Sequence, residues 1–115
     1  MEFTEKSLVE FTIKQTKAVE DFPFNGPNSH EKIVWHIIRH PKNKKIISMI
    51  FVKDNVLTIN LKLTADHVEH AITIPGVNHG YHMNKKYWVS VDVNNNELSQ
   101  EELKNMIMES FLLTV

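Results

Sequence analysis

The sequence contains no cysteine. This absence excludes disulfide bonds, thiolate chemistry and zinc sites built from cysteine ligands. The N-terminal segment MEFTEKSLVE is acidic and amphipathic, so it does not have the basic and then apolar pattern of a signal peptide. No apolar stretch approaches the ~20 residues that a membrane-spanning helix needs. We therefore expect a cytoplasmic protein with no membrane partner.

Signatures of catalysis are also missing. Only three glycines occur, at positions 26, 76 and 80, and they form no glycine-rich phosphate loop. Ser48, Ser90 and Ser110 lack the sequence context of a nucleophilic serine. No pair of carboxylates stands in an evident apolar cleft. We expect no catalytic residue, no cofactor and no enzyme activity.

The charge of the chain is nearly balanced but unevenly placed. The 115 residues fit one domain, 1–115, and their net charge of −1 argues against a dedicated, high-affinity nucleic-acid binder. The middle of the chain is nevertheless basic, with seven cations and the single anion Asp54 between positions 32 and 62. These cations are Lys32, Arg39, Lys42, Lys44, Lys45, Lys53 and Lys62. They could form a contact surface, or they could be solvated lysines of hairpins.

The hydrophobic periodicity predicts three helices and a mostly antiparallel sheet. Residues 4–20 read as an amphipathic helix that begins at Thr4, or at a capping box of Ser7 with Glu10. The proline-containing segment 21–29 cannot continue it. Further helices are predicted over 64–72 and from about residue 100, with Thr64 and Ser99 as N-caps. Strands are predicted over 32–39, 45–52, 56–63 and 87–93, where Tyr87 and the valines at 89, 91 and 93 point inward.

This order predicts a two-layer α+β domain with the arrangement α-βββ-α-ββ-α. It has about five strands and terminal helices on one face. The opposite face would then carry Asn60, Lys62, Trp88 and Ser90.

The segment Gly80–Val93, GYHMNKKYWVSVDV, is the most informative part of the chain. Trp88 lies between polar neighbours of its strand, which suits stacking on bases, or else it is covered by a loop such as 21–29. His82, Asn84, Lys85 and Lys86 precede it and supply the donors and charge that contact phosphates or base edges. The same residue types also serve turn formation alone.

Seven histidines raise the alternative of a metal site. His67 and His70 are three residues apart beside Asp66 and Glu69, and His79 and His82 have the same spacing. Neither pair has the HExxH context of a metalloprotease helix, so we predict no metal ligands.

Four segments together resemble the YjbR/MmcQ family: DFPF at 21–24, NLKL at 60–63, PGVNHGYHMNKKYWVSVDV at 75–93 and EELKNMIMESFLL at 101–113. The resemblance implies a compact fold similar to that of CyaY/frataxin. It also implies DNA binding, with β-hairpins as two wings. The positions that match the motifs of the family are Lys62, Tyr81, His82, Met83, Asn84, Lys85, Trp88 and Ser110. Two positions depart from the family pattern: Phe111 replaces a usual tyrosine, and Tyr87 replaces a frequent histidine.

The sequence therefore leads to one main hypothesis, weak and sequence-tolerant DNA binding by a monomer. The residues assigned to it are Arg39, Lys42, Lys44, Lys45, Lys62, His82, Asn84, Lys85, Lys86 and Trp88. The alternative is a protein- or small-ligand-binding module, in which Lys62, Tyr81, His82, Asn84 and Trp88 converge on a polar pocket. In a variant of that alternative, the motif only fastens a loop to the sheet through buried hydrogen bonds.

Overall fold

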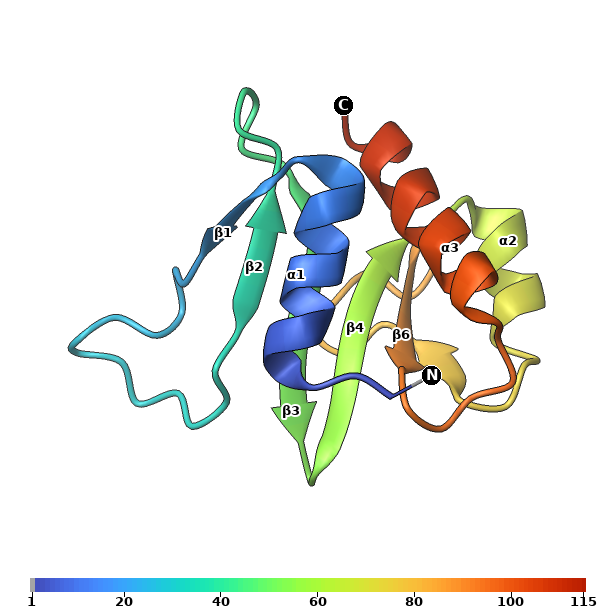
Figure 1. Ribbon diagram of the computed structural model, residues 1–115, viewed down its shortest axis with the longest axis horizontal. Coiled ribbons are helices and arrows are strands. Elements are labelled where there is room, and N and C mark those ends of the chain that lie inside the picture. The colour runs from blue at the N-terminus through green and yellow to red at the C-terminus, as the bar shows by residue number, and fades with distance from the viewer. Residues whose placement is uncertain (1) are drawn as a thin grey trace.

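The computed structural model describes residues 2–115, which form an antiparallel sheet and three helices (Figure 1). The strands lie in the order β1-β2-β3-β4-β6-β5. In chain order the elements are α1 (Glu5–Thr16), β1 (Val19–Asp21), β2 (His36–Arg39), β3 (Ile46–Lys53), β4 (Val56–Lys62), α2 (Ala65–Ala71), β5 (Val77–His79), β6 (Trp88–Asp92) and α3 (Gln100–Leu113). The predicted α+β class is confirmed.

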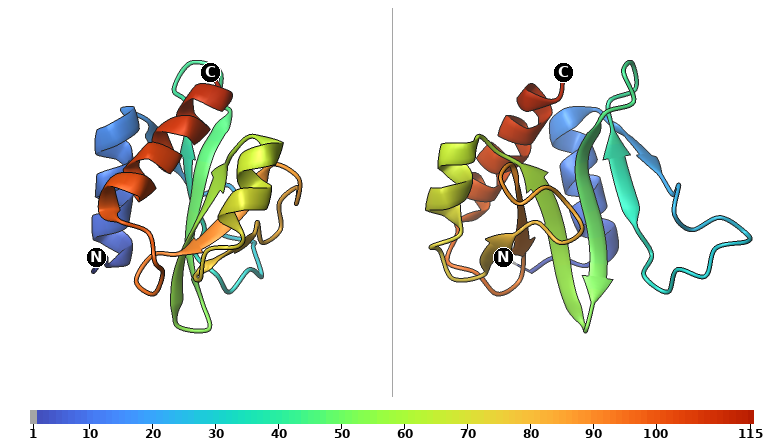
Figure 2. Two further views of the ribbon diagram at one scale, coloured as in Figure 1. Left: turned by 90° about the vertical axis from the view of Figure 1, so that its right-hand side faces the viewer. Right: turned by 180° about the vertical axis from the view of Figure 1, so that it is seen from behind.

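Helices α1 and α3 pack side by side on one face of the sheet, as predicted for the terminal helices (Figures 1 and 2). We call this the helix face and the opposite one the far face. Strand alternation sends one set of side chains to the helix face, where Ile50, Ile59 and Val89 meet Leu8 and Leu103 in the main core. Helix α2 adds Val68 and Ala71 to the same core beside β5 and β6. None of the helices within residues 2–115 has the length and hydropathy to cross a membrane.

The helix starts agree with the predicted caps. The Thr4 side chain accepts from the Ser7 backbone and Ser7 reciprocates, so the first of the two predicted starts of α1 is the correct one. Thr64 and Ser99 cap α2 and α3, and Glu102 completes the box of α3. Each cap satisfies backbone donors that the first turn leaves without an intrahelical partner.

The predicted first helix, 4–20, is too long. Lys17 adopts a left-handed conformation with φ 53° and ends α1, and Val19–Asp21 then pairs with β2 as an edge strand that the sequence analysis missed. The sheet therefore has six strands instead of about five. A three-residue strand with every residue exposed has no alternation of burial that could reveal it.

Strand β2 is shorter than the predicted 32–39, because residues 22–35 form an irregular loop. The Asn25 side chain closes this loop, donating to the Ile33 carbonyl at 2.8 Å and accepting from the Trp35 amide at 2.9 Å. These bonds occupy backbone groups that a longer strand would need for its ladder.

Ser110 of α3 holds the centre of the sheet together. Its hydroxyl accepts from the Lys62 amide at 2.9 Å and donates to the Ile47 carbonyl, directly beyond the last β3–β4 pair, Ser48 and Leu61. The hydroxyl thus bridges two backbone groups that would otherwise be left unpaired at the end of the ladder. Ser48, equally buried, has a hydroxyl with no hydrogen-bond partner in residues 2–115.

The two serines predict opposite results for the same substitution. Ser110→Ala should lower the free energy of unfolding by about 1–3 kcal/mol, because two buried backbone groups lose their partner. Ser48→Ala should cost nothing or stabilise the protein, because it removes an unpaired polar group. Urea denaturation of both variants measures this. Equal losses of stability would contradict the assigned role of Ser110.

Candidate nucleic-acid interface

The far face of the sheet carries a second, smaller core. Trp35, Ile37, Met49 and Phe51 are buried there, under partly buried Tyr81 and Met83. The Trp35 ring lies 4.4 Å from the Phe51 ring and 6.0 Å from the Tyr81 ring. Tyr81 and Met83 belong to segment 80–87, which crosses this face and is orange in the view from behind (Figure 2). The far face is therefore a covered surface, and its aromatic rings are mostly internal.

A buried polar network fastens this segment to the sheet. Asn60 and Ser90 are directly opposite each other on β4 and β6, and the Ser90 hydroxyl donates to the Asn60 side-chain carbonyl. The Asn60 amide donates to the Tyr81 carbonyl and the Tyr81 amide donates to Ser90 Oγ, both at 2.9 Å. Asn60 is fully buried, so each of these bonds replaces hydration that burial has removed.

Trp88 is buried, with only 8% of its surface exposed. Gly80 packs directly against the Cβ and backbone of Trp88. A Cβ on Gly80 would lie 2.7 Å from the Trp88 Cβ and 3.1 Å from its carbonyl carbon, so only glycine fits there. Trp88 is therefore not the exposed aromatic that base stacking requires. Lys62, its partner on β4, is half-buried.

Other residues of the motif are exposed. His82 has a left-handed φ of 60°, and its ring lies 4.1 Å from that of Tyr81. The Asn84 side chain accepts from the Lys86 amide at 2.8 Å, and its carbonyl accepts from the Trp88 amide at 3.0 Å. Asn84 thus closes the turn that presents Lys85 and Lys86. Tyr87, predicted to point inward, is instead 37% exposed.

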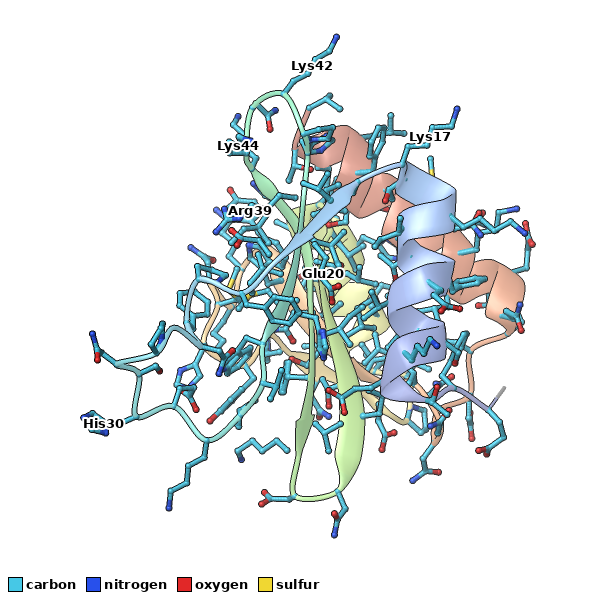
Figure 3. All side chains as sticks on the ribbon, turned by 60° about the vertical axis from the view of Figure 1, so that its left-hand side comes forward. Lys17, Glu20, His30, Arg39, Lys42 and Lys44 are labelled. Carbon is cyan, nitrogen blue, oxygen red and sulfur yellow. The ribbon has the colours of Figure 1, made fainter. Side chains whose placement is uncertain are left out.

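The hairpin between β2 and β3 projects from one end of the molecule (Figure 1). Lys42, Lys44 and Lys45 are exposed on it, and Lys42 points away from its tip (Figure 3). The base of the hairpin is tied to the end of α3, because His40 Nε2 lies 2.7 Å from Thr114 Oγ1 and Asn43 donates to the Thr114 carbonyl at 3.0 Å. The hairpin that carries the lysines is therefore attached to the rest of the fold by hydrogen bonds at its base.

Arg39 differs from these lysines. Its Nε donates to Asp21 at 3.1 Å and its Nη1 to the Lys44 carbonyl at 2.9 Å. These bonds connect β1, β2 and the hairpin, so Arg39 has a structural role before any ligand arrives.

Half of the fourteen acidic side chains belong to the helices and not to the strands and loops that carry the candidate cations. The helices carry Glu5, Glu10, Asp66, Glu69, Glu101, Glu102 and Glu109. Within residues 2–115, Lys53 is the only lysine in an ion pair, with Asp54 at 3.4 Å. The lysines of the hairpin and of segment 80–87 therefore remain available to an external anion. Lys53 itself was not among the predicted site residues, although alternation from Met49 and Phe51 places it on the far face.

The histidine pairs do not assemble into a metal site in the described part of the chain. His67 Nδ1 lies 2.8 Å from Glu109 of α3, and His79 Nδ1 lies 3.0 Å from the Lys85 carbonyl. Each of these two rings therefore bonds to a neighbouring segment.

The residues proposed for a shared polar pocket do not converge. A hollow of about 350 Å³ lies on the far face, and Tyr81 and Lys85 line it. Lys62, His82, Asn84 and Trp88 do not. The motif therefore divides into an internal part that fixes the segment and an exposed part that carries charge.

The polar network predicts that Asn60→Ala lowers the free energy of unfolding by about 1–3 kcal/mol, because the Tyr81 carbonyl and the Ser90 hydroxyl lose their partners. Hydrogen exchange of the Tyr81 backbone amide should also be faster in Asn60→Ala than in the wild type. Asn78→Ala is the matched control: Asn78 is exposed on the neighbouring edge strand, and its removal should change stability by less than about 0.5 kcal/mol. Unchanged exchange at Tyr81 in Asn60→Ala would refute the network.

The fold recurs in solved structures. A crystal structure of a protein from Pseudomonas syringae aligns with a TM-score of 0.81 at 24% identity, covering 98% of this chain and 100% of that one. A solution NMR structure from Pseudomonas syringae gives 0.73 at 24% identity, covering 98% and 94%. A Deinococcus radiodurans protein with a DUF419 domain gives 0.72 at 21% identity, covering 96% and 77%. At these identities the likeness establishes the fold alone.

No curated protein matches the chain significantly. A family model does match it, over residues 14–113, and its description is YjbR. The match takes in β1 to β6 and all of α3, including every motif residue of segment 80–93. The chain belongs to the YjbR family.

Proposed function

We propose that this protein binds duplex DNA weakly and with little sequence preference, through contacts to phosphates. The observation that carries the proposal is the group of exposed lysines on the hairpin, Lys42, Lys44 and Lys45, which have no carboxylate partner in residues 2–115. Lys85 and Lys86 add two exposed cations on segment 80–87. Neutralised phosphates release counterions, and this release drives binding that does not depend on base sequence.

The hairpin supplies the main contact in this proposal. It projects from the end of the sheet beside the end of α3, where it can approach a phosphate backbone (Figure 1). Lysine acts as a point charge toward phosphate, so the contact needs no exact side-chain geometry. Binding should therefore tolerate different sequences.

Base recognition has few candidates. Trp88 is buried and Arg39 is already bonded to Asp21, so neither is free to read a base. His82 and Asn84 are exposed beside the two lysines of segment 80–87 and could reach a groove edge. Hydrogen bonds to base edges add binding free energy to that of the phosphate contacts. Because few side chains can make such bonds here, we expect low affinity for DNA. The proposed role is binding without catalysis.

The proposal predicts a difference between two triple variants with the same net charge. Lys42→Gln/Lys44→Gln/Lys45→Gln should bind a fluorescein-labelled duplex more weakly than the wild type. The magnitude of its salt slope should fall by about 0.9 for each lost phosphate contact. Lys6→Gln/Lys14→Gln/Lys104→Gln removes as many charges from α1 and α3 and should bind like the wild type. Fluorescence anisotropy over a range of salt concentrations measures both.

Two results would overturn the proposal. One is the absence of any wild-type binding at low salt. The other is an equal loss of affinity in both triple variants, because that would indicate a response to net charge and not to the hairpin.

A titration with a duplex of unrelated sequence tests whether binding tolerates different base sequences. Affinities for the two duplexes that differ more than about tenfold would contradict this tolerance, since non-specific contacts do not discriminate between sequences.

A further inference from the structure

The hollow on the far face combines positive charge with unused polar groups. It has a volume of about 350 Å³ and lies between the β3–β4 turn and segment 78–85. Lys53 enters it from the end of β3, and Lys85 from the segment that crosses the sheet. Phe51 and Val56 provide an apolar wall. Two cations therefore meet at one concave site although they are far apart in the sequence.

Both ammonium groups already have neighbours, which are exposed at Lys53 and part-buried at Lys85. Lys53 Nζ lies 4.9 Å from the centre of the Tyr81 ring and 3.4 Å from the carboxylate of Asp54, whose side chain is 85% exposed. Lys85 Nζ donates to the Gly80 carbonyl. The exposed contacts of Lys53 contribute little to stability, so an incoming anion can displace them. Lys85 would exchange its bond to the Gly80 carbonyl for a bond to the anion. Asp54 is the one carboxylate on the lining.

Uncharged donors accompany these lysines. Tyr81 and Asn78 line the hollow, and neither the Tyr81 hydroxyl nor the Asn78 side-chain amide makes a hydrogen bond within residues 2–115. The Thr58 and Ser90 hydroxyls, by contrast, are already bonded to the Val56 carbonyl and to Asn60. A ligand would thus find two cations, two free polar groups and an aromatic ring.

We propose that this hollow binds a phosphate group carried by a ligand of mononucleotide size. The phosphate would lie between Lys53 and Lys85, and the sugar and base would lie against Tyr81 and the apolar wall. Lysine is a common point-charge ligand for phosphate, and aromatic rings bind bases by stacking. The volume is near the lower limit for ligand sites, which favours a small ligand. The phosphate could belong to a free nucleotide or to the end of a nucleic-acid strand.

This site is separate from the hairpin. Strand β3 begins beside the hairpin and ends at Lys53, and its eight residues span roughly 25 Å at the usual rise per residue. Lys85 belongs to both proposals, but the hairpin variants leave the hollow intact, so a loss of duplex binding in those variants and a loss of AMP binding at the hollow are separate results.

NMR titration of the full chain with AMP tests the proposal. The amide resonances of Asn78, His79 and Tyr81 should shift saturably, and inorganic phosphate should produce smaller shifts of the same resonances. Lys53→Gln/Lys85→Gln should weaken AMP binding at least tenfold, the usual order for losing hydrogen bonds to a charged group. Lys6→Gln/Lys14→Gln, which removes the same charge from α1, should bind AMP like the wild type.

Adenosine is the control for the role of the phosphate and should not shift these resonances. Absence of shifts with AMP, equal shifts with adenosine, or unchanged affinity in Lys53→Gln/Lys85→Gln would each overturn the proposal. A 5′-phosphorylated trinucleotide and its 5′-hydroxyl counterpart separate the two sources. Tighter binding of the phosphorylated trinucleotide than of AMP assigns the site to strand ends, and tighter binding of AMP assigns it to free nucleotides.

Discussion

The hydrogen-bond network of Asn60, Ser90 and Tyr81 determines how the far face of this protein is organised. A polar side chain at the centre of a sheet face destabilises the fold unless it finds partners, and Asn60 finds them in a hydroxyl on the adjacent strand and in the backbone of a crossing segment. With Tyr81 held in this way, its ring covers Trp35 and Phe51. The preceding residue, Gly80, lies against Trp88, and the turn at Asn84 follows within a few residues. The exposed lysines of the segment are positioned by this internal arrangement.

A consequence is that the segment most typical of the family has two physically different roles. Gly80, Tyr81 and Trp88 are internal, and their residue types follow from close packing and buried hydrogen bonds. Lys85 and Lys86 are external, and neither forms an ion pair within residues 2–115. A motif of this kind therefore says more about how the segment attaches to the sheet than about what the surface binds. Binding to an external partner involves the exposed residues, and these include the hairpin, which no family motif marks.

Local pattern predicted most of the fold, and long-range contacts explain what it missed. The period of two correctly placed Asn60, Ser90 and Trp88 on the face away from the helices, because alternation is a property of the strand itself. Alternation cannot show that another segment covers that face, so the burial of Trp88 was not decidable from sequence. The same limit applies to β1, whose existence depends only on pairing with β2, and to the hollow, where Lys53 and Lys85 meet through the crossing segment. For the main core and the helix caps, local signals were sufficient.

The lack of carboxylate partners for Lys42, Lys44 and Lys45 within residues 2–115 is what allows a nearly neutral chain to present a basic surface. Salt screens exposed charges beyond roughly 8–10 Å, so a phosphate beside the hairpin interacts mainly with Lys42, Lys44 and Lys45 and only weakly with carboxylates behind the sheet. Those carboxylates would still oppose an approach by the helix face and so favour one orientation of the molecule. The same screening limits long-range attraction, because at a distance a polyanion meets a net charge of −1. The attraction between the hairpin and DNA therefore acts only at short range, and few side chains contact bases. Both features of this fold make the expected binding weak.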